Sequence, residues 1–183
     1  MRLLVIPSEA PCVYERRGYG GWLRDYYNPC GLFDEVYAFC PDEPVDRDAH
    51  GMHILSRRRK DYGATVRGIC PDIVRAYGGY WPADLACAGR ASGIRVVVSV
   101  HDTNPDLLFG SVRYADAVIC MSKAVAERVR KKGVPPDRIR MLPNRVDRTV
   151  FKPLPPDHPE VTALRKRFGG GRFILHVGRH TAQ

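Results

Sequence analysis

Residues 95–102 read Arg-Val-Val-Val-Ser-Val-His-Asp, and this stretch decides the fold prediction. Its apolar run is short, is rich in β-branched residues and stops abruptly at two polar side chains. Such a run is typical of a strand that is covered on both faces, as in a parallel sheet. Because ligands of open α/β sheets bind at the carboxyl ends of the strands, His101 and Asp102 are candidate binding residues. The alternative is a histidine that ends the strand and bonds only to a loop.

Similar apolar runs recur along the chain and alternate with helical patterns. The runs suited to strands are residues 3–6, 35–40, 52–55, 72–77, 115–121 and 139–142. Helices are expected over 81–90 and over 123–132, where Ser122 is a good N-cap. We expect residues 7–11 to form an extended loop because of their two prolines. Strands that alternate with helices predict an α/β fold, a Rossmann-like doubly wound parallel sheet with helices on both faces.

A proline-rich segment divides the chain near its end. Residues 152–159 contain four prolines, a composition typical of a linker. A short helix is expected over 161–168, and one more apolar run follows at 173–179. We therefore expect a first domain over residues 1–150, a linker over 151–172 and the first strand of a second Rossmann-like domain over 173–183.

The net charge of +9 is carried by the second part of the chain. Residues 1–110 have a net charge of −1, and residues 111–183 have a net charge of +10. This asymmetry favours an anionic partner, for which the alternative is a solvated basic surface. The apolar start of the chain is too short for a signal peptide and no run is long enough to span a membrane, so we expect a cytoplasmic protein. The six cysteines lack zinc-ligand spacing, and no metal is expected.

A second candidate site lies between the first strand and the first helix. Residues 16–21 read Arg-Arg-Gly-Tyr-Gly-Gly, and a helix is expected from Trp22. Two adjacent glycines, Gly20 and Gly21, allow a backbone to approach a ligand closely, and the start of a helix behind them favours an anion. Their spacing is not that of the dinucleotide fingerprint, and a flexible turn is the alternative to a phosphate-binding loop.

Taken in order, several stretches resemble the GT-B glycosyltransferases of family 4, retaining enzymes that use nucleotide sugars. The likeness spans nearly the whole chain. The matching stretches are Gly20-Gly21 after the first strand, Pro71 to Ala76, Val96 to Asp102, Ala115 to Lys123, Pro143 to Asp147 with Phe151, and His176 to Arg179.

This resemblance implies a two-domain enzyme whose amino-terminal domain holds the acceptor and whose carboxy-terminal domain holds most of a nucleotide-sugar donor. It implies that Gly20 and Gly21 lie against the donor diphosphate and that His101 contacts the donor sugar. Arg179 would then pair with the diphosphate as the leaving group gains charge, a role that suits guanidinium.

The resemblance also suggests substrate contacts at other positions. The aromatic residues beside the glycine loop, Tyr19, Trp22 and Tyr26, are either acceptor contacts or ordinary packing and surface aromatics. The matching stretches add Asp102, Ser122 and Asn144 as candidate substrate-binding residues.

The implied function is metal-independent transfer of a hexose from a nucleotide sugar to a hydroxyl of a glycan or lipid carrier. Two departures from the family pattern are Arg145, which replaces a usual glycine, and the absence of the later Glu-x7-Glu element. The chain is therefore expected to be the amino-terminal portion of such an enzyme and to be inactive alone.

Two alternatives stay open. One is another GT-B sugar-nucleotide enzyme, such as an epimerase. The other is a non-enzymatic basic domain that binds an anionic membrane or nucleic acid. No nucleic-acid motif is present, so nucleic acid is not expected, whereas a basic surface favours contact with the inner face of the cell membrane.

Overall fold

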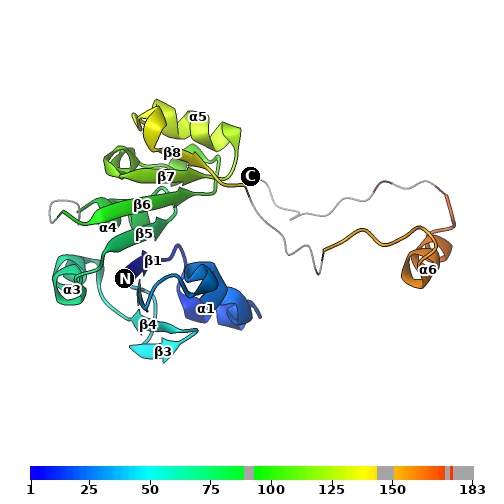
Figure 1. The fold of residues 1–183 in the computed structure, drawn as a ribbon, viewed down its shortest axis with the longest axis horizontal. Coiled ribbons are helices and arrows are strands. Elements are labelled where there is room, and N and C mark those ends of the chain that lie inside the picture. The colour runs from blue at the N-terminus through cyan, green and yellow to red at the C-terminus, as the bar shows by residue number, and fades with distance from the viewer. Residues whose placement is uncertain (89–92, 144–150, 172–173, 175–183) are drawn as a thin grey trace. The chain divides into compact units, whose positions relative to one another are not determined.

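The computed structural model describes residues 1–88, 93–143, 151–171 and 174. The chain divides into two compact units, Met1–Pro143 and Asn144–Gln183. The first unit is built around a sheet of eight strands, and Figure 1 shows these strands side by side in the order β3-β4-β2-β1-β5-β6-β7-β8. The strands are β1 (Arg2–Ile6), β2 (Glu35–Phe39), β3 (Arg47–Ala49), β4 (Met52–Leu55), β5 (Ile73–Tyr77), β6 (Arg95–Val100), β7 (Ala117–Cys120) and β8 (Ile139–Met141).

All neighbouring strands pair in parallel except β3, which pairs antiparallel with β4 at one edge. The strand order reverses at β1, because the chain first adds β2 and β4 on one side of β1 and then adds β5 to β8 on its other side. The predicted Rossmann-like, doubly wound sheet is therefore confirmed. Since parallel strands share one carboxyl edge, the loops after β1, β5 and β6 meet there.

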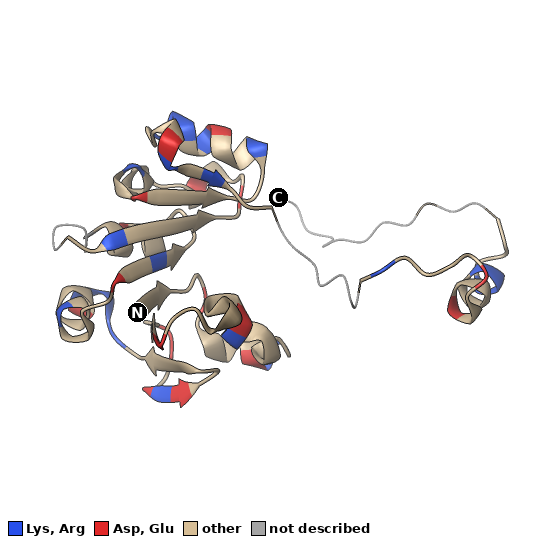
Figure 2. Ribbon diagram, viewed as in Figure 1, with Lys and Arg blue, Asp and Glu red and all other residues tan. Residues whose placement is uncertain are grey.

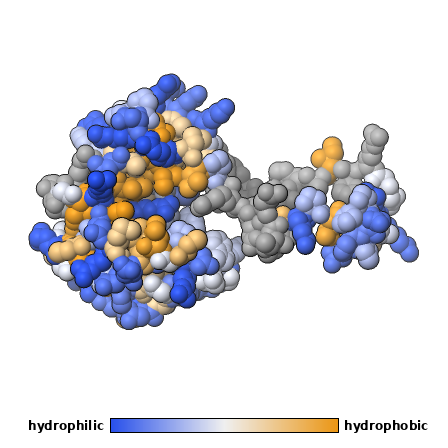
Figure 3. Space-filling view, viewed as in Figure 1, coloured by the Kyte–Doolittle hydropathy of each residue, from blue (hydrophilic) through white to orange (hydrophobic). Residues whose placement is uncertain are grey.

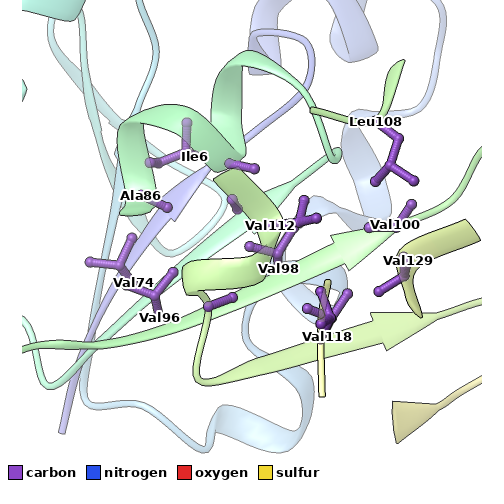
Figure 4. Packing of buried hydrophobic residues seen from close by; sticks show 14 of the residues in the cluster. Ile6, Val74, Ala86, Val96, Val98, Val100, Leu108, Val112, Val118 and Val129 are labelled. Atoms are coloured by element: carbon purple, nitrogen blue, oxygen red, sulfur yellow. The ribbon is translucent and has the colours of Figure 1, made fainter. Parts of the chain in front are cut away.

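Helices cover both faces of the sheet. The α-helices are α1 (Pro11–Arg16), α2 (Leu23–Tyr27), α3 (Tyr62–Ile69), α4 (Trp81–Ala88) and α5 (Lys123–Lys131). Side chains from α3, α4 and α5 belong to one apolar cluster on this face. Helix α4 packs on the even-numbered residues of β5 and β6, and α5 packs on β7 and β8; Figure 4 shows Ala86 near Val74 and Val96, and Val129 beside Val118. Burial of each such valine stabilises the fold by roughly 1.5–3 kcal/mol.

The opposite face holds a second apolar cluster. Leu23 and Tyr27 of α2 pack on Leu3 and Val5 of β1, and Tyr77 of β5 closes this cluster on its other side. Figure 3 shows apolar surface gathered across the middle of this unit. Tyr77 thus belongs to the core and also reaches the carboxyl edge of the sheet, where strand β5 ends.

One prediction about local structure was wrong, and one helix was missed. Residues 7–11 are not all extended, because Pro11 occupies the first turn of α1, where a proline fits without loss of a hydrogen bond. Helix α3 was not anticipated, since Gly63, Gly68 and the β-branched residues between them weaken the helical signal in the sequence. Its buried residues Tyr62 and Val66 supply the packing that the local sequence does not.

The second unit contains helix α6 (Pro159–Arg167), which confirms the short helix expected after the proline-rich segment. The predicted strand over 173–179 lies outside the described residues, apart from Ile174. The predicted boundaries at residues 150 and 172 stay predictions. Among the described residues, no helix is both long and apolar enough to cross a membrane.

Candidate functional site

A cavity of about 270 Å³ opens at the carboxyl edge of the sheet, where the strand order reverses. The loop after β1 contributes Ser8, helix α1 contributes Tyr14, and helix α2 contributes Tyr26 and Tyr27. The remaining wall comes from residues 77–80 at the end of β5, from residues 100–102 at the end of β6, and from Leu107. We call this cavity the switch-point pocket. Ligands of doubly wound sheets bind at this kind of place, because the loops on either side of the reversal diverge and leave a crevice.

A pair of glycines forms the wall that follows β5. Gly78 has a φ of +116°, and a Cβ there would lie 2.5 Å from the ring of Tyr80. A Cβ on Gly79 would lie 2.7 Å from Cδ1 of Leu108. The Gly78 N–H donates to the carbonyl of Ser99 at 2.8 Å, and the Gly79 carbonyl accepts from the N–H of Phe109 at 2.7 Å. The loops after β5 and β6 are therefore tied together at positions where only glycine fits.

His101 follows β6 directly and is exposed at the mouth of the pocket. Its ring stacks on Tyr77 with an interplanar angle of 11° and a centroid separation of 6.3 Å. Desolvation by the surrounding protein, with a smaller contribution from the positive charge of Arg75, lowers the pKa of His101 below its usual value. At neutral pH the imidazole is therefore uncharged, with one nitrogen able to donate and the other able to accept a hydrogen bond.

Arg75 lies behind Tyr77 on strand β5. Its guanidinium is 4.6 Å from the centroid of the Tyr77 ring, and its Nε and Nη2 atoms donate to the hydroxyl of Ser99 at 3.3 and 3.2 Å. Within the described part of the chain no carboxylate forms an ion pair with Arg75. The pocket therefore has an uncompensated positive charge behind one wall.

The pocket wall is rich in tyrosine. The hydroxyl of Tyr14 lies 3.5 Å from that of Ser8. Tyr77 is only 3% exposed, and its hydroxyl has no hydrogen-bond partner among the described residues. A buried hydroxyl without a partner carries a free-energy penalty of about 1–3 kcal/mol, which a ligand that bonds to it would remove. Tyrosine rings also offer flat apolar faces beside polar edges.

The structure brings only part of the predicted site together. His101 and Asp102 both line the switch-point pocket, and Asp102 also accepts a hydrogen bond from the N–H of Asn104 at 2.7 Å. Ser122 is exposed, and its hydroxyl accepts from the N–H of Val125 at 3.3 Å, so it acts as the N-cap of α5. Asn144 and Arg179 lie outside the described residues.

Gly20, Gly21 and Trp22 form the 3₁₀ helix η1 (Gly20–Trp22) and do not line the pocket. A Cβ on Gly20 would lie 3.1 Å from Cγ of Glu15 and 3.3 Å from Cε1 of His50, whereas Gly21 has open space around it. Trp22 is 52% exposed and contacts Tyr26, its ring centroid lying 6.3 Å away. Through Tyr26 this loop is next to the pocket rather than in it.

Four charged or titratable side chains, Glu15, Glu43, Arg47 and His50, form a group beneath Gly20 that we call the glycine-loop cluster. Arg47 donates to both carboxylate oxygens of Glu15, at 2.9 and 3.0 Å, and to Glu43 at 2.8 Å. His50 Nε2 lies 2.6 Å from Glu15 Oε1. The hydrogen bonds from Arg47 lower the pKa of Glu15, with help from His50.

Among the pocket residues that sequence reasoning missed are Tyr14, Tyr77, Tyr80 and the pair Gly78-Gly79. The glycine pair had a visible signal, because it follows a predicted buried strand immediately and precedes a helix. The tyrosines had none, since only the fold brings Tyr14, Tyr77 and Tyr80 to one cavity.

The described residues include no group of three or more His, Cys, Asp or Glu side chains arranged to hold a metal ion. Away from the pocket, helix α5 carries most of its basic residues on its exposed surface, which Figure 2 shows in blue. Val125 and Val129 hold its apolar side on the sheet.

Solved structures that share this fold include a galactosyltransferase, a UDP-bound protein and a UDP-N-acetylglucosamine 2-epimerase. The lipopolysaccharide outer core galactosyltransferase WaaB in its apo form is 18% identical, with a TM-score of 0.57 over 87% of this chain. The Anabaena protein HepE in complex with UDP is 16% identical, with a TM-score of 0.60 over 92% of this chain. UDP-N-acetylglucosamine 2-epimerase from Rickettsia bellii is 11% identical, with a TM-score of 0.56 over 92%.

The chain spans about half the length of these proteins, 50% of WaaB and of HepE and 48% of the epimerase. A search of curated protein sequences finds no match. The sequence profile of Glycosyltransferase Family 4 matches residues 34–150, which include β2 to β8 and the loops of His101 and Gly78-Gly79. The chain belongs to this glycosyltransferase family.

Proposed function

We propose that this chain is the acceptor-binding portion of a retaining glycosyltransferase that moves a hexose from a nucleotide sugar to a hydroxyl of a glycan or lipid carrier. The observation that supports this function best is the switch-point pocket, in which a neutral imidazole, a tyrosine hydroxyl without a partner and a glycine wall converge. Family membership supplies the reaction class, and HepE was solved with UDP and with UDP-glucose.

In this proposal His101 positions the donor sugar by hydrogen bonds and does not act as a base. Its ring stacks on Tyr77, which favours one orientation of its nitrogens. Arg75 contributes positive charge to the same wall, which favours the anionic donor electrostatically. Arg179 would stabilise the departing diphosphate, and Gly20, Gly21, Ser122 and Asn144 stay proposed substrate contacts. No metal is part of this mechanism.

The test is sugar transfer, measured with a panel of nucleotide sugars and glycan acceptors. It is run on the 183-residue chain and on a chimaera that joins the chain to the donor half of HepE or WaaB. We expect transfer only from the chimaera. His101→Ala should lower its rate about 100-fold, the size of loss seen when one preorganised hydrogen-bond donor is removed. Unchanged turnover in that variant would eliminate the proposed role of His101.

A second candidate function is epimerisation of a nucleotide sugar, which the fold match to UDP-N-acetylglucosamine 2-epimerase supports. The two functions differ in their need for an acceptor. If a sugar nucleotide is converted to its epimer when no acceptor is present, then the function is epimerisation and not sugar transfer.

We also propose peripheral contact with an anionic membrane, at the cytoplasmic face, through the basic surface of α5. Lys123, Arg128, Arg130 and Lys131 are exposed, and each contributes about 1 kcal/mol near an anionic surface. Binding to vesicles that contain phosphatidylglycerol should therefore weaken steeply as salt rises. Absence of binding at low salt would end this part of the proposal.

A further inference from the structure

A continuous row of aromatic rings leads out of the switch-point pocket to the protein surface. It begins at Tyr77, which stacks on His101, and passes to Tyr26 at a centroid separation of 5.2 Å. It continues to Trp22 at 6.3 Å and ends at Tyr19 at 5.6 Å. We call this the aromatic row. It connects the buried end of the pocket with the loop that contains Gly20.

The outer rings are exposed although each has a large apolar surface. Tyr26 is 41% exposed, Trp22 is 52% exposed and Tyr19 is 48% exposed. Single exposed aromatics are common on protein surfaces, whereas a contiguous set that runs into a cavity marks a binding surface. The row is therefore better explained by a ligand than by packing of the isolated domain.

The inner part of the row is held rigidly. Tyr26 packs edge-on against Tyr27 at 5.1 Å, and Tyr27 is 1% exposed. Leu23, also 1% exposed, anchors the same short helix to the sheet. At the other end, Glu15 and His50 support the backbone at Gly20. Rings that are fixed before binding lose little conformational entropy when a ligand arrives, which strengthens binding.

The chemistry of the row fits sugar rings. A pyranose has apolar C–H faces and a rim of hydroxyls, and the row offers flat ring faces with tyrosine hydroxyls at their edges. The row extends over three successive centroid separations of 5.2, 6.3 and 5.6 Å, which is longer than a single sugar ring, so more than one sugar unit is needed to cover it. The charges beside it are mixed, since Arg24 and Asp25 are both exposed and Arg17 is paired with Glu9 at 2.8 Å. A neutral ligand is favoured over a strongly anionic one.

We infer that the aromatic row binds an acceptor oligosaccharide, with its terminal sugar beside His101 and the preceding sugars on Tyr26, Trp22 and Tyr19. This inference rests on the proposed transferase function for the identity of the ligand as an acceptor. It adds that the acceptor is a glycan of at least two sugars and that exposed aromatic side chains outside the pocket make affinity depend on the length of this glycan.

The experiment measures binding of neutral oligosaccharides to the 183-residue chain. An oligosaccharide array, which includes mono-, di- and trisaccharides of the common hexoses, identifies the best series. Affinities within that series are then measured by NMR titration. For the unchanged chain we expect affinity to rise from monosaccharide to trisaccharide. Trp22→Ala should weaken trisaccharide binding about 10-fold or more and leave monosaccharide binding unchanged. Tyr19→Ala should reduce only the gain from the third sugar.

Tyr114→Ala is the matched control, because Tyr114 is 49% exposed and lies in the 3₁₀ helix η6 (Gly110–Tyr114), outside the pocket. The inference is overturned if no di- or trisaccharide binds, if affinity does not rise with length, or if Tyr114→Ala weakens binding as much as Trp22→Ala. It is also overturned if the NMR signals of Trp22 change when phosphatidylglycerol vesicles are added but not when any oligosaccharide is added, since that result would make the row a membrane contact. Loss of transfer in the chimaera with intact oligosaccharide binding would count against the proposed donor chemistry alone.

Discussion

Two polar regions of the first unit, the glycine-loop cluster and the switch-point pocket, differ in how their charges are paired. In the cluster, Arg47 bonds to two carboxylates and His50 bonds to one of them, so every charge has an ion-pair partner, although Oε2 of Glu43 accepts no hydrogen bond from the described residues. In the pocket, Arg75 has no carboxylate partner among the described residues, and the hydroxyl of Tyr77 has no partner at all among them. Paired groups stabilise a fold, whereas groups left unpaired in a cavity are available to a ligand.

The comparison also gives each region a distinct role in the proposed function. The cluster lies under Gly20 and holds the loop that carries Trp22 and Tyr19. In the proposed function, the pocket would hold the reacting end of the substrates. Substitutions in the cluster should therefore act mainly on stability, and substitutions in the pocket should act mainly on binding.

The largest effect is expected from Arg47→Ala. The side chain of Glu43 has no exposed surface, and Arg47 is its ion-pair partner. Removal of one partner leaves an uncompensated buried charge, which destabilises a protein by about 3–5 kcal/mol. Urea unfolding followed by far-ultraviolet circular dichroism gives this value. The control is Arg57→Ala, because the pair of Arg57 with Asp46 is 39% and 46% exposed, and its loss should change stability by about 0–1 kcal/mol. Equal effects of the two substitutions would show that burial of Glu43 does not matter.

The glycine wall of the pocket gives the next effect. Gly79→Ala places a methyl group 2.7 Å from Leu108 and 3.1 Å from the carbonyl oxygen of Leu107, so these loops must move apart. The expected loss of stability is about 1–3 kcal/mol, as for other overpacked sites. Gly68→Ala in α3 is the control, since nothing lies within 4 Å of its added Cβ. Alanine is a better helix former, and this variant should gain up to about 1 kcal/mol. A Gly79→Ala variant as stable as the unchanged chain would contradict the tie between the loops.

A third pair of variants separates a merely buried hydroxyl from one that serves a ligand. Tyr62 and Tyr77 are each 3% exposed with hydroxyls that lack partners among the described residues. Tyr62→Phe and Tyr77→Phe should both raise stability by about 1 kcal/mol, because each removes an unsatisfied polar group. Only Tyr77→Phe should weaken oligosaccharide binding, by about 2- to 10-fold, the value of one hydrogen bond. Equal binding by both variants would show that the Tyr77 hydroxyl does not contact the ligand.

Much of the fold was predictable from the sequence, because many of its elements are determined by short local patterns of residues. The valine-rich run before His101 and the spacing of Val125 and Val129 each depend on a few neighbouring residues. Helix α3 was missed because packing of Tyr62 and Val66 decides it against a weak local preference. The antiparallel strand β3 was missed for a similar reason, since it exists only by pairing with β4.

Site residues were predictable from the sequence only where they directly follow a recognisable strand. His101 and Asp102 follow a recognisable strand, and the structure places both in the pocket. The glycine pair chosen from the sequence, Gly20-Gly21, lies outside the pocket, whereas Gly78-Gly79 lines it. The difference comes from the strands: β5 lies beside β1 at the reversal of the sheet, an order that is not visible in the linear sequence.

The smallest effect expected is a difference in acid sensitivity between the two regions. The pKa of His101 lies below its usual 6.5 in the folded chain, so the unfolded chain binds this proton at a higher pH. The stability that His101 contributes is therefore complete above pH 6.5 and is lost as the pH falls below that value. The pKa of Glu15 lies below its usual 4.5, so its contribution is lost only as the pH falls below 4.5.

Melting temperatures measured from pH 8 to pH 3 should therefore decline in two stages. His101→Gln should flatten the decline that begins near pH 6.5 and leave the stage below pH 4.5, whereas Glu15→Gln should do the reverse. If His101→Gln leaves the first stage unchanged, then another group titrates there, and the imidazole is not held neutral by the pocket. A neutral His101 is what the proposed site requires, because an imidazolium would donate from both nitrogens and could not accept a hydrogen bond from a sugar hydroxyl.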